Sequence, residues 1–177
     1  ENAEKLNRNA FKLVVGGDSA GGNLANAVSM LTKEQNGPTI SAQILIYPVT
    51  NMFFDTSSYR EFQSGYGLDK EKMIWYSNHY INDELDKKDK YIAPLLSDDL
   101  SDLPPTLIVI AEYDVLRDEG LAYATRLKEV GVKVNTICEK GLIHGYFTNM
   151  GIFQERIQVT VSKIKKFLSE TCQKNIF

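Results

Sequence analysis

Cysteine and histidine are scarce in this sequence, which limits the chemistry that it can support. Its 177 residues contain two cysteines and two histidines. Cys138 and Cys172 lie far apart, whereas a disulfide framework or a zinc site needs more cysteines or a closer spacing. An Asn-x-Ser/Thr glycosylation site is absent as well. We therefore expect no metal, no organic cofactor, and a reducing compartment such as the cytoplasm.

Positive charge and long apolar runs are also missing. The net charge is −3 and the pI is about 5.5, which argues against a nucleic-acid partner, because such proteins carry a basic surface. No apolar run approaches the ~18 residues of a membrane span. The first residues, 1–5, do not have the pattern of a signal peptide. The length is that of one domain, residues 1–177.

The segments that are present alternate between strand-like and helix-like. Apolar runs predict strands at 11–15, 42–47, 106–111 and 132–139, and helical spacing predicts helices at 20–35, 69–81, 118–130 and 152–169. Strands separated by helices predict an α/β fold with parallel strands and helices on both faces of the sheet.

The apolar spacing within the helices also predicts which side chains point inward. These are Leu24, Ala27, Val28 and Leu31 in the first helix, Leu121, Ala124, Leu127 and Val130 in the third, and Ile157, Val161, Ile164 and Leu168 in the last. Asp118 is expected to cap the third helix, and Gly131 to end it.

Two features of this plan need explanation. The segment 49–103 is a long polar and aromatic excursion, in which Asp69 caps the helix at 69–81 and the acidic run 97–102 has the pattern of a solvated loop. An excursion of this size is more often functional than idle. In addition, the strand at 11–15 would lie at a sheet edge, although its apolar pattern is typical of a strand buried on both faces.

The residues that carry chemistry begin with G-G-D-S-A-G-G at 16–22, directly after the first strand. Gly17 to Gly21 match G-x-S-x-G, with a strand before and a helix after, which is the context of a nucleophile elbow. Ser19 would then sit on a strained turn, and the backbone N–H of Ala20 would point at a developing oxyanion. A dinucleotide loop would need glycine at Asp18, and a phosphate loop would need a lysine after the glycines. A turn without chemistry remains open.

A serine nucleophile needs a base, and only two histidines are available. His79 lies within the helix at 69–81, among aromatic residues that indicate packing or a solvated face. His144 follows the last strand, so it should lie at the carboxyl edge of the sheet together with Ser19. His144 is therefore the predicted base.

The acid should lie at the same edge. Asp114 follows the strand at 106–111, Asp118 is the expected helix cap, and the facing of Glu112 is uncertain. We assign Asp114, which completes the chain order Ser, Asp, His that is typical of α/β-hydrolases.

The motifs G-D-S-A-G-G-N-L-A, L-I-Y-P, L-P-P-T-L-I-V-I-A-E-Y-D-V-L-R-D-E-G and I-H-G-Y-F closely resemble those of the hormone-sensitive-lipase-like α/β-hydrolases, which include carboxylesterases, acetyl esterases and arylacetamide deacetylases. The resemblance implies that the four strands are strands 5–8 of an eight-stranded sheet. It implies that Ser19, Asp114 and His144 form the catalytic triad, and that Leu116 and Tyr146 lie near the substrate.

This resemblance also implies parts that the sequence lacks. The H-G-G-G segment of the family, which supplies further oxyanion donors, does not occur here. Strands 1–4 are expected in an N-terminal part of the same hydrolase domain, which would cover the edge strand. An uncovered edge leaves association into a homo-oligomer open.

The expected function is hydrolysis of carboxylic esters with short acyl chains through an acyl-serine intermediate. Esterase and amide deacetylase activities are not distinguished by the sequence. A ligand-binding protein on the same scaffold is an alternative, because plant gibberellin receptors resemble this family and have lost the histidine that is His144 here. An inactive fragment is another alternative.

Overall fold

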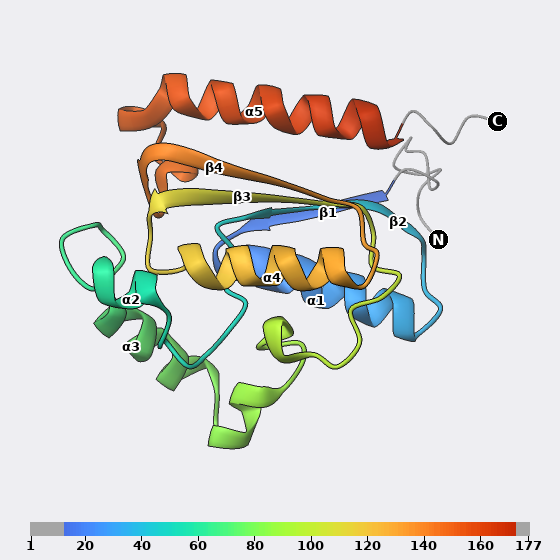
Figure 1. Cartoon of the computed structure of the whole chain (residues 1–177), viewed down its shortest axis with the longest axis horizontal. Coiled ribbons are helices and arrows are strands. Elements are labelled where there is room, and N and C mark those ends of the chain that lie inside the picture. The colour runs from blue at the N-terminus through green and yellow to red at the C-terminus, as the bar shows by residue number, and fades with distance from the viewer. Residues whose placement is uncertain (1–12, 173–177) are drawn as a thin grey trace.

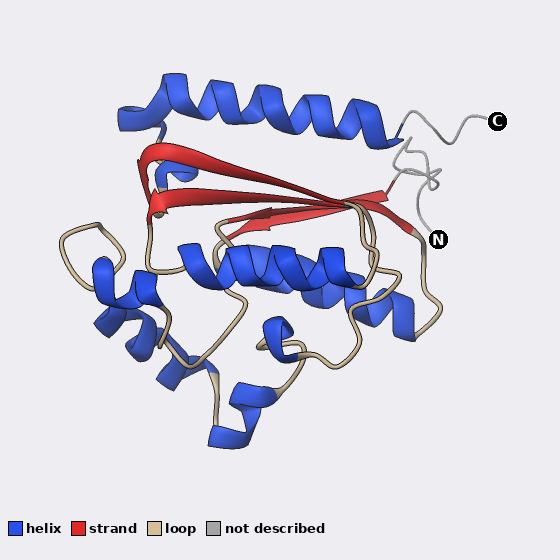
Figure 2. Ribbon diagram, viewed as in Figure 1, coloured by secondary structure: helices blue, strands red, loops and turns tan. Residues whose placement is uncertain are grey.

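The computed structural model describes residues 13–172, which form a parallel sheet between two layers of helices (Figure 1, Figure 2). The strands lie side by side in chain order: β1 (Leu13–Asp18), β2 (Ile40–Ile46), β3 (Thr106–Tyr113) and β4 (Val134–Ile143). Helices α1 (Ala20–Glu34) and α4 (Arg117–Glu129) cover one face, and α5 (Met150–Cys172) covers the other. The predicted α/β fold with parallel strands is confirmed.

The strand β3 forms the centre of the core, because helices cover it on both faces. Ile108 and Ile110 pack with the cluster under α1 and α4, whereas Leu107 and Val109 pack with the cluster under α5. All four side chains are at most 1% exposed. A strand covered on both faces has a continuous apolar sequence, which explains the run T-L-I-V-I-A.

The prediction for α1 was right about Ala27 but wrong about Leu24 and Val28. These two side chains are 55% and 45% exposed, and the buried face instead contains small or polar residues and Met30. The helix approaches the neighbouring turn closely at its start, where a Cβ at Gly22 would lie 3.0 Å from Cβ of Pro48. Glycine is therefore favoured at this position, and Met30 is the largest side chain on the buried face.

In α4 the predictions were right for Ala124 and Leu127 and wrong for Leu121 and Val130, which are 38% and 41% exposed. The buried stripe is displaced around the helix because Tyr123 fills the space under it. In α5, Ile157 is buried, and the other three predicted side chains are half-buried against the same cluster: Val161, Ile164 and Leu168.

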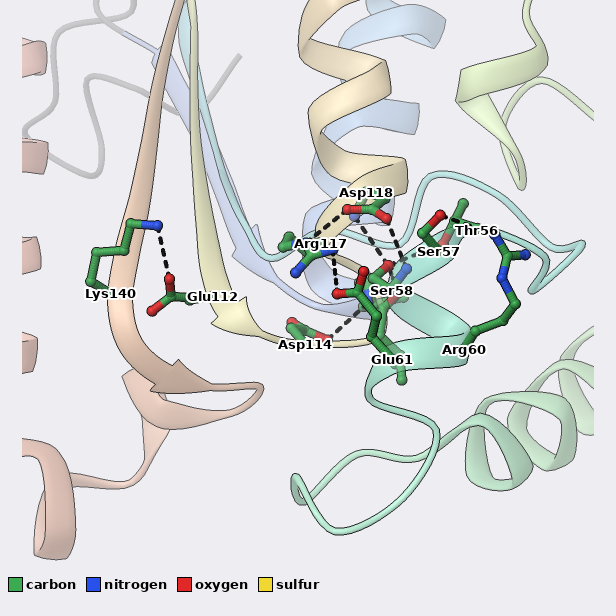
Figure 3. Close-up of polar contacts among 12 residues, drawn as sticks. Thr56, Ser57, Ser58, Arg60, Glu61, Glu112, Asp114, Arg117, Asp118 and Lys140 are labelled. Carbon is green, nitrogen blue, oxygen red and sulfur yellow. Dashed lines mark hydrogen bonds and ion pairs between the residues drawn. The ribbon is translucent and has the colours of Figure 1, made fainter.

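Asp118 does not cap α4, which corrects the second prediction for this helix. The capping position is Leu116, and Asp118 lies in the first turn. Its carboxylate accepts hydrogen bonds from the backbone nitrogen of Ser58 at 2.8 Å and from Nε of Arg117 at 2.7 Å (Figure 3). Asp118 therefore connects α4 to the short helix α2 (Ser57–Glu61) of the excursion. Gly131 has φ of 86° directly after α4, as expected for a helix end.

The excursion is folded, and its apolar side chains pack in a cluster that also includes Val115 and Leu116 after β3. The excursion contains α2, α3 (Lys70–Tyr80), and the 3₁₀ turns η1 (Glu84–Lys88) and η2 (Pro94–Leu96). Asp69 caps α3 by accepting from the backbone nitrogen of Lys72, as predicted. The acidic run is only partly solvated, because Leu100 is fully buried in the core under α1 and α4.

The strand β1 lies at the edge of the sheet, as expected. Within residues 13–172 it pairs only with β2, and Leu13 is 42% exposed. The first two residues of the predicted strand, Phe11 and Lys12, lie outside the described residues. The strand β4 ends later than predicted, at Ile143, so His144 follows it directly.

Candidate active site

Ser19 lies on a strained turn between β1 and α1. Its φ and ψ are 55° and −120°, a conformation that L-residues rarely adopt. A Cβ at Gly17 would lie 2.3 Å from the carbonyl oxygen of Gly21, so only glycine allows the strand and helix to meet this closely. The backbone nitrogen of Ser19 donates to the carbonyl of Ile46 at 2.9 Å. This geometry is that of a nucleophile elbow.

The three residues assigned from the sequence form one chain of hydrogen bonds. Oγ of Ser19 lies 2.9 Å from Nε2 of His144, and Nδ1 of His144 lies 2.7 Å from Oδ2 of Asp114. The other oxygen of Asp114 accepts from the backbone nitrogen of Leu116 at 2.9 Å. A proton on Nδ1 of the imidazole leaves Nε2 free to accept the hydroxyl proton of the serine.

The competing residues of the sequence lie elsewhere. Glu112 pairs with Nζ of Lys140 at 2.8 Å, away from Asp114 (Figure 3), and the hydrogen bond from Lys140 lowers the pKa of this carboxyl. Asp118 bonds to α2, as described above. His79 stacks on Trp75 with ring centroids 4.1 Å apart, on the exposed side of α3. None of the three takes part in the hydrogen-bond chain of Ser19.

A cavity of about 440 Å³ opens above Ser19. Its walls come from the elbow, from the segment after β2 and from α3: Ser19, Ala20, Asn23, Leu24, Val49, Met52, Leu68, Met73, Tyr76, Ser77, Tyr80 and His144. Most of these side chains are apolar, so the cavity suits an apolar group. The excursion thus contributes one wall of the cavity, in line with the expectation that it is functional.

Ala20 lines this cavity as the first residue of α1. The N–H groups of a first helical turn have no acceptor within the helix, and they favour a negative charge nearby. Leu116 and Tyr146, in contrast, are not among the lining residues; they are 1% and 0% exposed. Leu116 holds Asp114 through its backbone, and the hydroxyl of Tyr146 lies 3.0 Å from Oγ1 of Thr160. Both therefore support the site from the interior.

Two buried residues near the triad were missed in the sequence. Tyr47 follows β2, and its ring centroid lies 4.5 Å from that of His144. Glu119 is fully buried in α4, where Oε1 accepts from the backbone nitrogens of Thr50 and Asn51 at 2.7 and 3.1 Å. Burial raises the pKa of Glu119 to about 8, and the nearby carboxylate of Asp114 adds to the effect. Glu119 lies four and eight residues before the buried Tyr123 and Leu127, which is the spacing of one helix face, and this was the signal that could have identified it.

Between residues 13 and 172, no group of three or more His, Cys, Asp or Glu is placed to hold a metal ion. None of the helices described is both long and apolar enough to cross a membrane.

Comparison with known proteins shows clear relatives. A family model described as the alpha/beta hydrolase fold matches residues 1–148. An arylesterase of Saccharolobus solfataricus is 37% identical over 162 residues, which are 91% of this chain and 52% of the relative. An ethyl acetate hydrolase of Pseudomonas putida is 35% identical over 156 residues, which are 88% of this chain and 49% of the relative.

Among solved structures, the thermostable carboxylesterase EstE1 from a metagenomic library superposes with a TM-score of 0.89 at 35% identity, over 96% of this chain and 58% of that one. The chain thus spans about half the length of the curated relatives it matches. The chain belongs to the α/β-hydrolase-fold family, as the resemblance of its motifs to the hormone-sensitive-lipase-like esterases predicts.

Proposed function

We propose that this chain carries the catalytic triad of a carboxylic ester hydrolase that works through an acyl-serine intermediate. The observation that supports the proposal most directly is the hydrogen-bond chain from Ser19 through His144 to the buried Asp114. Ser19, at one end of these hydrogen bonds, lines the apolar cavity, where the carbonyl of an ester can meet its Oγ. The names of the relatives, an arylesterase and an ethyl acetate hydrolase, point to the same reaction.

In the first half of the reaction, Oγ of Ser19 bonds to the carbonyl carbon while its proton moves to Nε2 of His144. The negative charge on the carbonyl oxygen is stabilised by the N–H of Ala20. When the bond to the leaving alcohol breaks, His144 returns the proton to that alcohol. Water then attacks the carbonyl carbon of the acyl-serine while its proton moves to Nε2 of His144. When the bond to Oγ of Ser19 breaks, His144 returns the proton to Ser19 and the carboxylic acid is released. Asp114 holds the imidazole and balances its positive charge in both halves of the reaction.

The substrate that we propose is an ester with a short acyl chain. The cavity of about 440 Å³ lies between Ser19 and α3, and its apolar walls match an alkyl or aryl group. Among residues 13–172, the side chains that line it include no Asp, Glu, Lys or Arg, so a charged acyl group would lose its hydration without gaining an ion pair there.

We further propose that efficient catalysis needs a second polypeptide part against the free edge of β1. The strand β1 pairs only with β2 among the described residues, and its first residue, Leu13, is an apolar side chain that is 42% exposed, which suits such a cover. The N–H of Ala20 is a single oxyanion donor, whereas an oxyanion hole usually contains more than one. Loss of one donor typically lowers the rate by about 10²–10³-fold. The 177-residue chain alone should therefore hydrolyse p-nitrophenyl acetate very slowly.

The test is covalent trapping of Ser19. A fluorophosphonate should label the protein that carries this chain, and mass spectrometry should locate the phosphonyl group on Ser19. Ser19→Ala should abolish both labelling and hydrolysis of p-nitrophenyl acetate. Labelling at another residue, or unchanged hydrolysis by Ser19→Ala, would overturn the proposal. A ligand-binding protein would keep its ligand affinity in Ser19→Ala and would show no turnover in either form.

A further inference from the structure

Tyr47 is a buried aromatic residue in direct contact with the base of the proposed triad. It follows β2 and is 1% exposed. Its ring centroid lies 4.5 Å from that of the His144 imidazole, with an angle of 52° between the two planes. The ring of Tyr146 packs edge-on against the same ring, with centroids 5.8 Å apart. The imidazole is therefore held against an aromatic ring that is itself held in place.

The backbone around Tyr47 is hydrogen-bonded to the segments that carry the other two residues of the proposed triad. The backbone nitrogen of Tyr47 donates to the carbonyl of Val109 at 2.6 Å, on the strand that leads to Asp114. The preceding carbonyl, that of Ile46, accepts from the backbone nitrogen of Ser19 at 2.9 Å. Tyr47 thus lies between the strand that carries the acid and the elbow that carries the nucleophile.

The conformation of Tyr47 is strained. Its φ is 34°, which is rare for a bulky residue. Its hydroxyl lies 3.4 Å from Oδ2 of Asp18, and Thr148 and the backbone of Phe147 are also partners of this hydroxyl. A strained residue persists only where its surroundings fix it, and such residues gather at functional sites.

We propose that Tyr47 is a positioning residue of the triad, whose ring holds the His144 imidazole between Ser19 and Asp114 and stabilises the positive charge that it gains. This inference rests on the proposed function, because the charge appears only when Nε2 of His144 takes the proton of Ser19. The centroid of the imidazole lies 4.5 Å from that of the Tyr47 ring, within the ~6 Å over which a cation is attracted to an aromatic ring, so the charge that His144 gains would lie in this range.

Two substitutions at Tyr47 separate the shape of the ring from its charge distribution. Tyr47→Phe keeps the face of the ring and removes the hydroxyl. Tyr47→pentafluorophenylalanine keeps nearly the same shape but reverses the charge distribution over the face. A residue that only fills space would tolerate both changes equally, whereas a residue that stabilises the imidazolium would not.

The experiment measures fluorophosphonate labelling of Ser19 in the protein that carries this chain, as the inactivation constant KI and the rate constant kinact. Tyr47→Phe serves as the reference, because it keeps the face of the ring and lacks the hydroxyl in the same way as the fluorinated variant. Tyr47→pentafluorophenylalanine should lower kinact by about 2- to 30-fold relative to Tyr47→Phe, the range that corresponds to a cation–π attraction. KI should stay constant, because Tyr47 does not line the cavity.

Tyr123 provides the matched control. It is also fully buried, and its hydroxyl bonds to Oδ1 of Asn26 at 2.7 Å, in the core under α1 and α4. The Phe and pentafluorophenylalanine variants of Tyr123 should have the same kinact. Equal kinact for the two Tyr47 variants would overturn the inference while leaving the triad intact. Absence of labelling in the unchanged protein would instead overturn the proposed function.

Discussion

Oε1 of Glu119 lies 2.7 Å from the backbone nitrogen of Thr50, in the interior of the protein. This bond joins α4, which begins just after Asp114, to the segment after β2 that supplies Val49 and Met52 to the cavity wall. A fully buried carboxyl is expensive when ionised. The relationship therefore couples the stability of the site to the charge of one side chain.

Glu119→Gln should change how stability depends on pH. The folded-state pKa of Glu119, about 8, lies above the ordinary value of 4.5. The contribution of this group to stability is therefore fully present below about pH 4.5 and is lost as the pH rises through about 8. Glutamine does not ionise, so the free energy of unfolding of Glu119→Gln should rise relative to that of the unchanged protein between pH 5 and pH 8. The rise should be at most of the order of 1.4 kcal/mol per unit of pKa difference.

Urea unfolding at several pH values measures this effect. The matched control is Glu129→Gln, an exposed carboxyl on the same helix, which should follow the unchanged protein across the whole range. If Glu119→Gln and Glu129→Gln gave the same pH dependence, a raised pKa for Glu119 would be excluded.

Ser19→Gly should be more stable than Ser19→Ala, although both should be inactive. The backbone at this position has φ of 55° and ψ of −120°, which glycine adopts without the strain that a Cβ causes. We expect a difference of about 1–2 kcal/mol in the free energy of unfolding. Denaturant midpoints of the two variants check this. Equal midpoints would mean that the elbow stores no strain.

Gly17→Ala and Gly21→Ala should have opposite consequences. A Cβ at Gly17 would lie 2.3 Å from the backbone oxygen of Gly21, so the elbow would have to open, with a cost of about 1–3 kcal/mol or more and loss of Ser19 labelling. At Gly21 the nearest atom to a new Cβ is 4.0 Å away, inside a helix that alanine favours. Thermal unfolding and fluorophosphonate labelling of the pair test this. Comparable losses in both variants would contradict the geometry.

Asp114→Asn and Asp118→Asn should distinguish the two neighbouring acids. Asparagine at 114 can hold the imidazole in the wrong tautomer, so labelling of Ser19 should fall by about 10³- to 10⁴-fold with little unfolding. Asp118→Asn should weaken the bonds to Ser58 and Arg117, and so lower the stability of the excursion while labelling stays within a few-fold. Labelling rates at a temperature where both variants are folded give the answer. A larger loss for Asp118→Asn would reverse the assignment.

Much of the site could be predicted from the sequence because its parts depend on local structure. G-D-S-A-G between an apolar run and a helix defines a sharp turn within a few residues, and parallel strands bring the residues after their carboxyl ends to one edge of the sheet. The positions of Ser19, Asp114 and His144 follow from these two facts. The end of α4 at Gly131 and the cap at Asp69 are local in the same sense.

What only the tertiary structure decided is which neighbour each side chain meets. Leu24 and Val28 fit an apolar helix face by spacing, yet the face of α1 that packs against the interior carries small and polar residues and Met30. Asp118 has the residue type of a cap, but the backbone of Ser58, distant in the chain, is its partner. Hydrophobic spacing and capping preferences describe one element at a time. The partners of Tyr47, Asp118 and Glu119 lie on other elements, so their positions depend on how those elements pack together.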